Sequence, residues 1–117
     1  MPAGTVLTVV FELAGQRFMG LNAGPRFPFT EAISLMVNCD TQEEIDDYWR
    51  KLTDGGREVA CGWVKDRYGL SWQIVPSQIL DMLSNGTPEQ AGRVMHAVNN
   101  MIKLDIGELR RAFDGRA

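Results

Sequence analysis

The pattern of the sequence changes at Pro76, and this change sets the order of secondary structure that the chain can adopt. Before Pro76, short runs rich in β-branched and aromatic residues alternate with glycines, prolines and polar turns, which is typical of strands. Five such runs predict strands at residues 5–13, 17–21, 32–38, 58–64 and 70–75. The link Ala14-Gly15-Gln16 predicts that the first two form a hairpin. After Pro76 the apolar residues follow a helical spacing.

One helix is predicted between the third and fourth strands. Its apolar stripe has the i, i+3, i+4, i+7 spacing: Ile45, Tyr48, Trp49 and Leu52. Thr41 with Glu44, or Asp40 with Glu43, gives the spacing of a capping box at its start. Gly55-Gly56 is expected to end it, because glycine is the usual residue beyond a helix C-terminus.

Three more helices are predicted after Pro76: a short one at residues 77–83, one that starts at Thr87 and a last one capped by Asp105. The segment 87–90 offers an N-cap, a proline at the first helical position and a capping partner. Six residues are predicted to form the apolar face of the second of these helices: Ala91, Val94, Met95, Val98, Met101 and Ile102. His96, the only histidine, lies off this face and is predicted to be exposed. The order of elements predicts an α+β fold with an antiparallel or mixed sheet.

The composition describes one globular domain. The chain has 117 residues, of which 44% are hydrophobic, and we expect a hairpin at 4–22, a βαββ module at 31–76 and a helical tail at 77–115. The net charge of -3, without a cluster of basic residues, argues against nucleic acid as a partner. No signal peptide or membrane-spanning run is visible, so we expect no membrane partner and a cytoplasmic location in which Cys39 and Cys61 are reduced thiols.

Four stretches of the sequence carry a family resemblance. They are residues 21–25 (LNAGP), 29–34 (FTEAIS), 37–44 (VNCDTQEE) and 61–76 (CGWVKDRYGLSWQIVP). Together they resemble the PhnB-like family, also labelled 3-demethylubiquinone-9 3-methyltransferase-like, within the glyoxalase/bleomycin-resistance (vicinal oxygen chelate) superfamily. The likeness runs over nearly the whole chain.

The resemblance implies paired βαβββ modules whose curved sheets close around a cleft. Residues 32–75 correspond to a complete second module, whereas residues 5–21 correspond only to the closing hairpin of the first. The missing strand and helix would leave an open sheet edge and an uncovered apolar face. We therefore expect a homodimer in which one chain covers the other, with a truncated product as the alternative.

The resemblance also implies where a divalent metal ion would bind in related enzymes. By its register, Gln73 stands where many relatives place a glutamate ligand, and Ala32 stands where they place a histidine. Glu31 is one residue away from that position, which on a strand points to the opposite face. An amide and a methyl group suit a dication poorly, so we predict no cofactor. A divalent metal ion remains the alternative if a partner chain supplies carboxylates.

With Gln73 taken to point into the cleft, alternation puts Ser71 and Val75 beside it, and Ser34 and Met36 share this face on the third strand. Trp72 and Ile74 would then face the helix, and Ile33 would pack under Trp49.

Asn22, which ends its strand, could offer another amide, and with Trp63 it completes the set of candidate ligand-binding residues. These are Gln73, Ser71, Asn22, Ser34, Met36 and Trp63. Neutral hydrogen-bonding groups between apolar walls suit a small, largely uncharged organic molecule. A structural role is the alternative for each: Trp63 and Trp72 as core or interface, Asn22 as a strand-end cap and Gln73 as an amide satisfied within the sheet.

Two further readings concern residues near these candidates. Cys61 has no clear base near it in the sequence and is predicted to be a structural thiol. The segment 65–67 is predicted to be a solvated turn.

Three functions follow from these observations. The first is a protein that binds a small molecule, and the second is a metal-assisted enzyme acting on a small carbonyl or aromatic compound. The third is an interaction module that uses the methionine-bearing tail, namely Met82, Met95 and Met101. Methyl transfer, which the family label suggests, is not supported, because the glycines do not form the glycine-rich strand-to-helix turn of a typical methyl-donor site.

Overall fold

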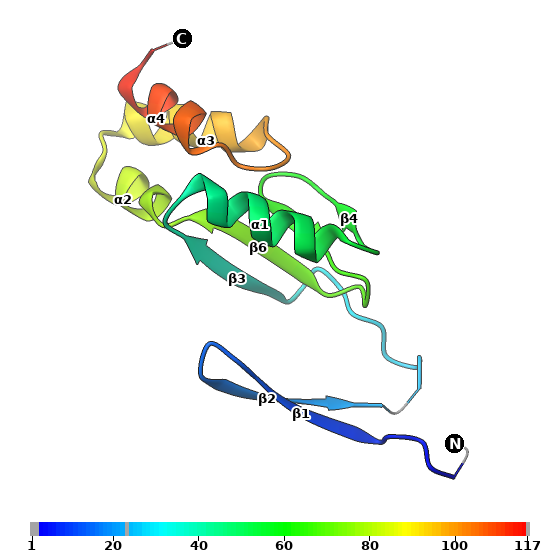
Figure 1. Ribbon diagram of the computed structural model, residues 1–117. Helices are drawn as coiled ribbons and strands as arrows, with labels where there is room; N and C mark the ends of the chain where they lie inside the picture. Colours follow the sequence, from blue (N-terminus) through cyan, green and yellow to red (C-terminus); the bar gives the residue numbers. More distant parts are fainter. Residues whose placement is uncertain (1–2, 23, 117) are drawn as a thin grey trace.

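The computed structural model describes residues 3–22 and 24–116, and it contains two separate sheets and a group of helices (Figure 1). The two-stranded sheet is a hairpin of β1 (Thr8–Leu13) and β2 (Gln16–Leu21). The four-stranded sheet contains β3 (Ser34–Cys39), β4 (Arg57–Glu58), β5 (Trp63–Lys65) and β6 (Ser71–Pro76). The helices are α1 (Gln42–Thr53), α2 (Gln78–Asn85), α3 (Pro88–Asn99) and α4 (Ile106–Asp114). The predicted α+β class is confirmed.

The four-stranded sheet is mixed and has the order β3-β6-β5-β4. β3 and β6 are parallel, and the other two pairs are antiparallel. Helix α1 packs on one face of this sheet through a cluster of buried residues: Cys39, Ile45, Trp49, Val64 and Ile74. The face toward α1 was predicted to carry Trp72 and Ile74, and the structure agrees.

The ends of α1 are set by local hydrogen bonds. The Glu44 backbone N–H donates to the Thr41 hydroxyl at 3.2 Å, and the Asp40 backbone N–H donates to the Glu44 carboxylate at 3.3 Å. The helix ends before Gly55, which has a left-handed φ of 77° that favours glycine. Both signals were predicted from the sequence.

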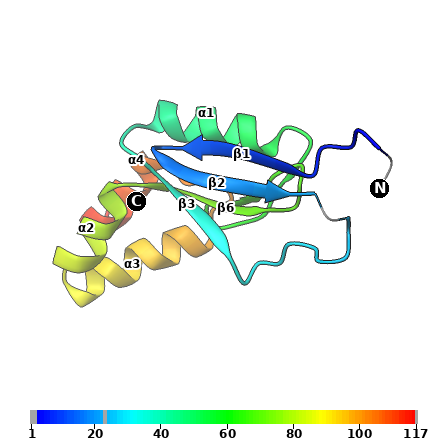
Figure 2. The ribbon, with the colours of Figure 1, turned by 90° about the horizontal axis from the view of Figure 1, so that it is seen from below.

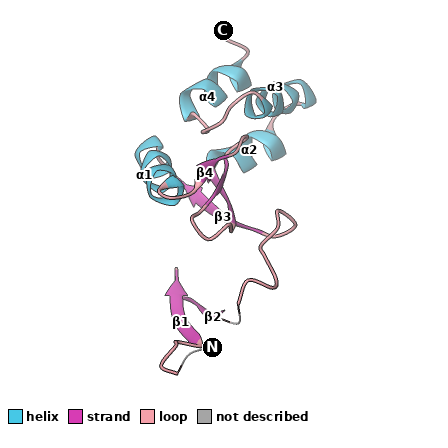
Figure 3. Cartoon of the chain, turned by 90° about the vertical axis from the view of Figure 1, so that its right-hand side faces the viewer, coloured by secondary structure: helices cyan, strands magenta, loops and turns pink. Residues whose placement is uncertain are grey.

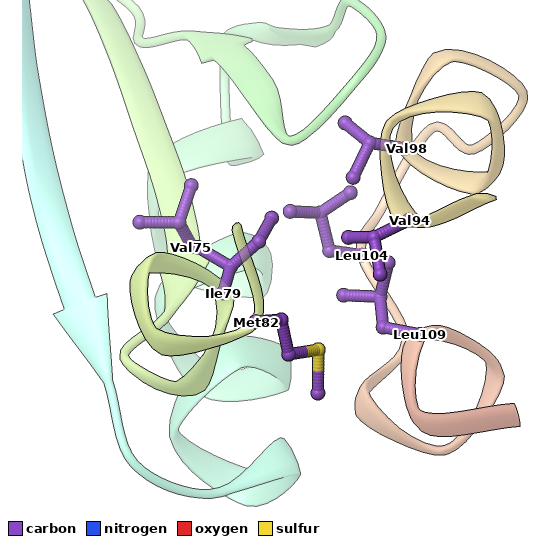
Figure 4. Close-up of a cluster of buried hydrophobic side chains, with 7 residues drawn as sticks. All are labelled: Val75, Ile79, Met82, Val94, Val98, Leu104 and Leu109. Atoms are coloured by element: carbon purple, nitrogen blue, oxygen red, sulfur yellow. The ribbon is translucent and has the colours of Figure 1, made fainter. Parts of the chain in front are cut away.

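The helical tail forms a second core on the other side of the sheet. Figure 2 shows α1 and α3 on opposite sides of the strands. Figure 4 shows the buried residues of this second core, which come from β6, from helices α2, α3 and α4, and from the α3–α4 connection: Val75, Ile79, Met82, Val94, Val98, Leu104 and Leu109. The predicted capping box of α3 is present, with Thr87 and Gln90 bonded to each other in both directions.

Three predictions about strands and faces were wrong. The run 58–64 is not one strand, because the chain leaves the sheet between β4 and β5 and the backbone N–H groups of Cys61 and Gly62 bond to the tail carbonyls of Met101 and Ile102, each at 2.8 Å. The third strand begins at Ser34, which leaves Ile33 72% exposed instead of under Trp49. On the predicted apolar face of α3, Met95 is exposed, and Ile102 lies beyond the end of the helix and is 52% exposed. The half-buried Ala97 packs against the core instead.

The hairpin stands apart from the rest of the chain (Figures 1 and 3). Every residue of β1 and every residue of β2 except Phe18 is exposed. The molecule measures 61 × 26 × 24 Å, and its radius of gyration is 17.4 Å, against about 13 Å for a compact domain of this length. The hairpin therefore takes no part in either hydrophobic core of this chain.

Within residues 3–22 and 24–116, the structure contains no helix with the length and apolar character needed to cross a bilayer.

Gly56 allows two backbone segments to approach each other closely. A Cβ atom at this position would overlap the carbonyl oxygen of Lys65 and would lie 2.8 Å from the carbonyl carbon of Asp66. No side-chain rotation can relieve a contact between backbone atoms. The close approach fixes the end of β5, where Lys65 lies.

We predict that Gly56→Ala lowers the free energy of unfolding by about 1–3 kcal/mol, because the strands must move apart. Gly92→Ala is the matched control, since Gly92 is exposed in α3 and its added Cβ would meet no atom within 4 Å. That substitution should stabilise the protein by about 0.5–1 kcal/mol. Urea unfolding measures both, and equal effects of the two substitutions would contradict the close packing at Gly56.

Candidate functional site

The face of the four-stranded sheet opposite α1, called here the open face, gathers most of the predicted ligand-binding side chains. Paired residues on neighbouring strands point to the same face, so alternate residues form rows across it. One row crosses all four strands: Ser34, Ser71, Lys65 and Arg57. The next row crosses three strands: Met36, Gln73 and Trp63.

Gln73 lies in the middle of the open face. Its side-chain amide donates a hydrogen bond to the Ser34 hydroxyl at 2.9 Å. Trp63 is its direct neighbour on β5, and Met36, 52% exposed, is its neighbour on β3. The structure thus brings together five of the six residues proposed from the sequence, and their role in binding remains a prediction.

Ser71 and Lys65 form a partly buried polar pair at one end of this face. Ser71 is 1% exposed, and its hydroxyl has no hydrogen-bond partner within the described residues. The side chain of Lys65 is 19% exposed and makes an ion pair with Glu31, which belongs to the segment between the hairpin and β3. The hydrogen bond from Lys65 lowers the pKa of Glu31, so the pair is present at neutral pH and is lost as the pH falls through that lowered pKa.

Asn22, the sixth proposed residue, lies elsewhere. Its backbone N–H donates to the Leu7 carbonyl at 2.7 Å, and its side-chain amide donates to the Val6 carbonyl at 3.0 Å. These bonds close the open end of the hairpin. Within one chain Asn22 is therefore a strand-end cap, which the sequence offered as the alternative to ligand binding.

The far end of the open face is closed by the helical tail. Val75, which was expected to line the cleft beside Gln73, is buried against α2 and α3. Cys61 packs against the same tail cluster, in agreement with a structural thiol. Both cysteines are unpaired, and burial raises the pKa of the Cys39 thiol. The part of the open face that the tail does not cover thus extends from Gln73 towards Lys65.

The turn after β5 has a more specific role than solvation. The Asp66 carboxylate accepts hydrogen bonds from the backbone N–H groups of Tyr68 and Leu70 at 2.9 and 3.1 Å, which shapes the turn. Its other oxygen accepts the indole N–H of Trp72 at 2.9 Å. Asp66 therefore holds β5 and β6 in register. Arg67 is exposed, as predicted for a solvated turn, whereas Lys65 and Asp66 are half-buried, which corrects that prediction.

The donor groups on the open face do not fit a divalent cation. The Gln73 side-chain amide is bonded to the Ser34 hydroxyl, and both groups are neutral. The row beside them carries the Lys65 ammonium ion, which repels a dication. Ala32 lies before β3, and its methyl side chain offers no ligand atom. No group of three or more potential metal-binding side chains occurs among the residues that the structure describes.

A separate open hollow of about 770 Å³ lies between α3 and α4. Its lining includes Arg93, His96 and Ala112. The guanidinium group of Arg93 donates to the Ala112 and Phe113 carbonyls, both at 2.8 Å. It therefore caps carbonyl groups of the last turn of α4. His96 is exposed, as predicted. This hollow shares no residue with the open face.

Sequence reasoning missed Lys65 and Arg57 as members of the open face. Lys65 was read as part of a turn, yet β5 extends to it and alternation from Trp63 places it on the same face. The spacing of two residues from Trp63 was a usable signal. Arg57 could not be placed, because the break between β4 and β5 depends on contacts with the tail.

Comparisons with known proteins identify the family. A family model described as 3-demethylubiquinone-9 3-methyltransferase matches residues 1–75, more than half of the chain. A solved PhnB protein from Bacillus cereus, provisionally described as a 3-demethylubiquinone-9 3-methyltransferase, is 38% identical with a TM-score of 0.58, over 63% of this chain and 67% of that one. The chain belongs to the PhnB-like family.

A second solved structure supports the fold of this PhnB-like protein. Protein PA1353 from Pseudomonas aeruginosa is 18% identical with a TM-score of 0.51, over 65% of this chain and 68% of that one, which shows a likeness of fold alone. No curated protein matches the chain. The resemblance noted in the sequence is confirmed at the level of the family.

Removal of the hydroxyl group should change the free energy of unfolding differently at the two serines of the open face. Ser34→Ala leaves the Gln73 amide without its acceptor and should cost about 1 kcal/mol of unfolding free energy. Ser71→Ala removes an unpaired buried hydroxyl and should be neutral or stabilising by up to about 1 kcal/mol. Urea unfolding measures both. A loss at Ser71 as large as that at Ser34 would mean that the Ser71 hydroxyl has a partner.

Proposed function

We propose that this PhnB-like protein binds a small organic molecule on the open face of its sheet, in a cleft that a second copy of the chain completes. The observation that carries the proposal is the half-buried Gln73 amide, which lies between Met36 and Trp63 with Ser34 as its hydrogen-bond partner. Apolar walls around a few oriented polar groups are the usual composition of a small-molecule site.

The exposed hairpin is the argument for a second copy of the chain. Its two faces both carry apolar side chains: Val10, Met19 and Leu21 on one, and Val9, Phe11, Leu13 and Phe18 on the other. A two-stranded hairpin is marginally stable by itself in water. The open face of the sheet also lacks a cover over Met36. A symmetric exchange, in which each hairpin covers the open face of the other chain, would bury both surfaces.

Methyl transfer has little support from the site. Among the described residues, both strands of the parallel pair lead into a helix: β3 into α1 through Asp40 and Thr41, and β6 into α2 through Ser77. Neither connection contains a glycine. A typical methyl-donor site uses a glycine-rich turn there to approach its cofactor closely. Metal-assisted chemistry would require carboxylates from outside the open face described above.

Binding can be tested by NMR on the ¹⁵N-labelled chain with a library of small neutral and anionic fragments. We expect hits to shift the Gln73 side-chain amide and the Trp63 indole signals. Gln73→Leu should weaken binding of those hits by about tenfold, since it removes the oriented hydrogen-bonding group. Asn99→Leu, which removes an amide from the exposed end of α3, is the control and should change nothing.

Two results would overturn the proposal. One is a library that produces no shifts on the open face. The other is a set of hits whose affinities are unchanged in Gln73→Leu.

A further inference from the structure

The row that crosses the four strands carries two positive charges side by side. Lys65 on β5 and Arg57 on β4 are direct neighbours in the register, and both project from the open face. Arg57 is exposed, while the Lys65 side chain is mostly buried at 19% exposure. An ammonium ion held in a partly desolvated position binds anions more strongly than one that is free in water.

The hydroxyl group next to Lys65 has no partner. Ser71 pairs with Lys65 across β5 and β6, and Ser34 pairs with Ser71 across β6 and β3. The Ser71 hydroxyl is buried and unpaired within the described chain, which is a costly arrangement unless an acceptor reaches it. The row thus combines an ammonium ion, a guanidinium ion and, buried beside the ammonium ion, a hydroxyl donor without a partner.

A carboxylate already lies at this place in the free chain. Glu31 makes the ion pair with Lys65, and the charge of Arg57 also acts on it. Glu31 belongs to no strand or helix, and its side chain is 60% exposed. The arrangement shows that a carboxylate fits against Lys65 and that the one present comes from an exposed connecting segment.

We infer that Lys65, with Arg57 and Ser71, forms an anion subsite that takes the carboxylate of a small organic acid, and that Glu31 occupies this subsite when no ligand is bound. The inference rests on the proposed binding function and names its ligand class. The apolar or aromatic body of the acid would extend along the next row, over Gln73 towards Met36 and Trp63. The sequence predicted a largely uncharged ligand because Lys65 was not recognised as a residue of this face.

The test uses a matched pair of probes, 2-naphthoate and its neutral amide 2-naphthamide, titrated into the ¹⁵N-labelled full chain at neutral pH. Naphthoate should bind about tenfold more tightly than naphthamide, because it gains a charge-assisted hydrogen bond. Lys65→Met should lower the affinity for naphthoate by about tenfold and leave naphthamide unchanged. Lys51→Met is the control, since Lys51 makes its ion pair with Asp47 on the exposed side of α1.

Glu31→Gln should have the opposite effect. Without the competing carboxylate, naphthoate should bind several times more tightly, by about three- to tenfold. A residue that only supports the fold would not increase affinity when it is substituted. The amide spectra of both variants report whether the fold is retained.

The outcomes separate the inference from the function on which it rests. If the two probes bind equally well on the open face and Lys65→Met alters neither, the small-molecule site stands and the anion subsite is overturned. If Glu31→Gln weakens naphthoate binding, Glu31 is a ligand-binding residue and not a competitor, which also overturns the inference. If neither probe shifts signals of the open face while fragments of the library do, the anion subsite is overturned and the proposed function stands; if no fragment shifts them either, both proposals fail.

Discussion

The fold of this chain depends on how the apolar surface of the β1–β2 hairpin is removed from water. The helices and the four-stranded sheet bury apolar side chains within the chain, because α1 and the helical tail form two hydrophobic clusters on opposite sides of that sheet. The hairpin belongs to neither cluster, and its apolar side chains are exposed on both faces. Exposed apolar surface on this scale usually marks a site of association.

The candidate site lies on the face of the four-stranded sheet that the helical tail covers only in part. Gln73, Trp63 and Met36 lie on the face that α1 does not protect, and Lys65 continues that face to the edge where the connecting segment from the hairpin passes. A second copy that places its hairpin over this face would exclude water from the site. Exclusion of water would strengthen the interaction between Lys65 and a bound carboxylate. Association and ligand binding would then be coupled through one surface.

Local signals in the sequence were sufficient to predict much of the fold. The caps at Thr41, Thr87 and Asp105 are formed by residues three positions apart, so each could be recognised without knowledge of the tertiary structure. The break in the strand after Glu58 could not be predicted from local signals. It depends on hydrogen bonds from the backbone N–H groups of Cys61 and Gly62 to the carbonyls of Met101 and Ile102, some 40 residues later in the tail. The burial of Val75 under the tail has the same non-local origin.

The candidate site was predicted in part for a similar reason. Period-two alternation on β6 and β3 placed Gln73, Ser71, Ser34 and Met36 on one face, and this requires only the register within a sheet. Lys65 was missed because its strand was expected to end one residue earlier. Arg57 was missed because β4 is only two residues long and pairs through a connection that the sequence does not reveal.

The most direct test of this account is the mass of the intact chain in solution, measured by light scattering on a sizing column. The account predicts twice the 13.1 kDa of one chain, with the mass falling to that of one chain when Val10 and Met19 are both replaced by aspartate. The exposed Leu80 on α2, replaced by aspartate, is the control and should leave the dimer intact. A well-folded monomer at all concentrations would contradict the account, because the open face would then have no cover from a second copy.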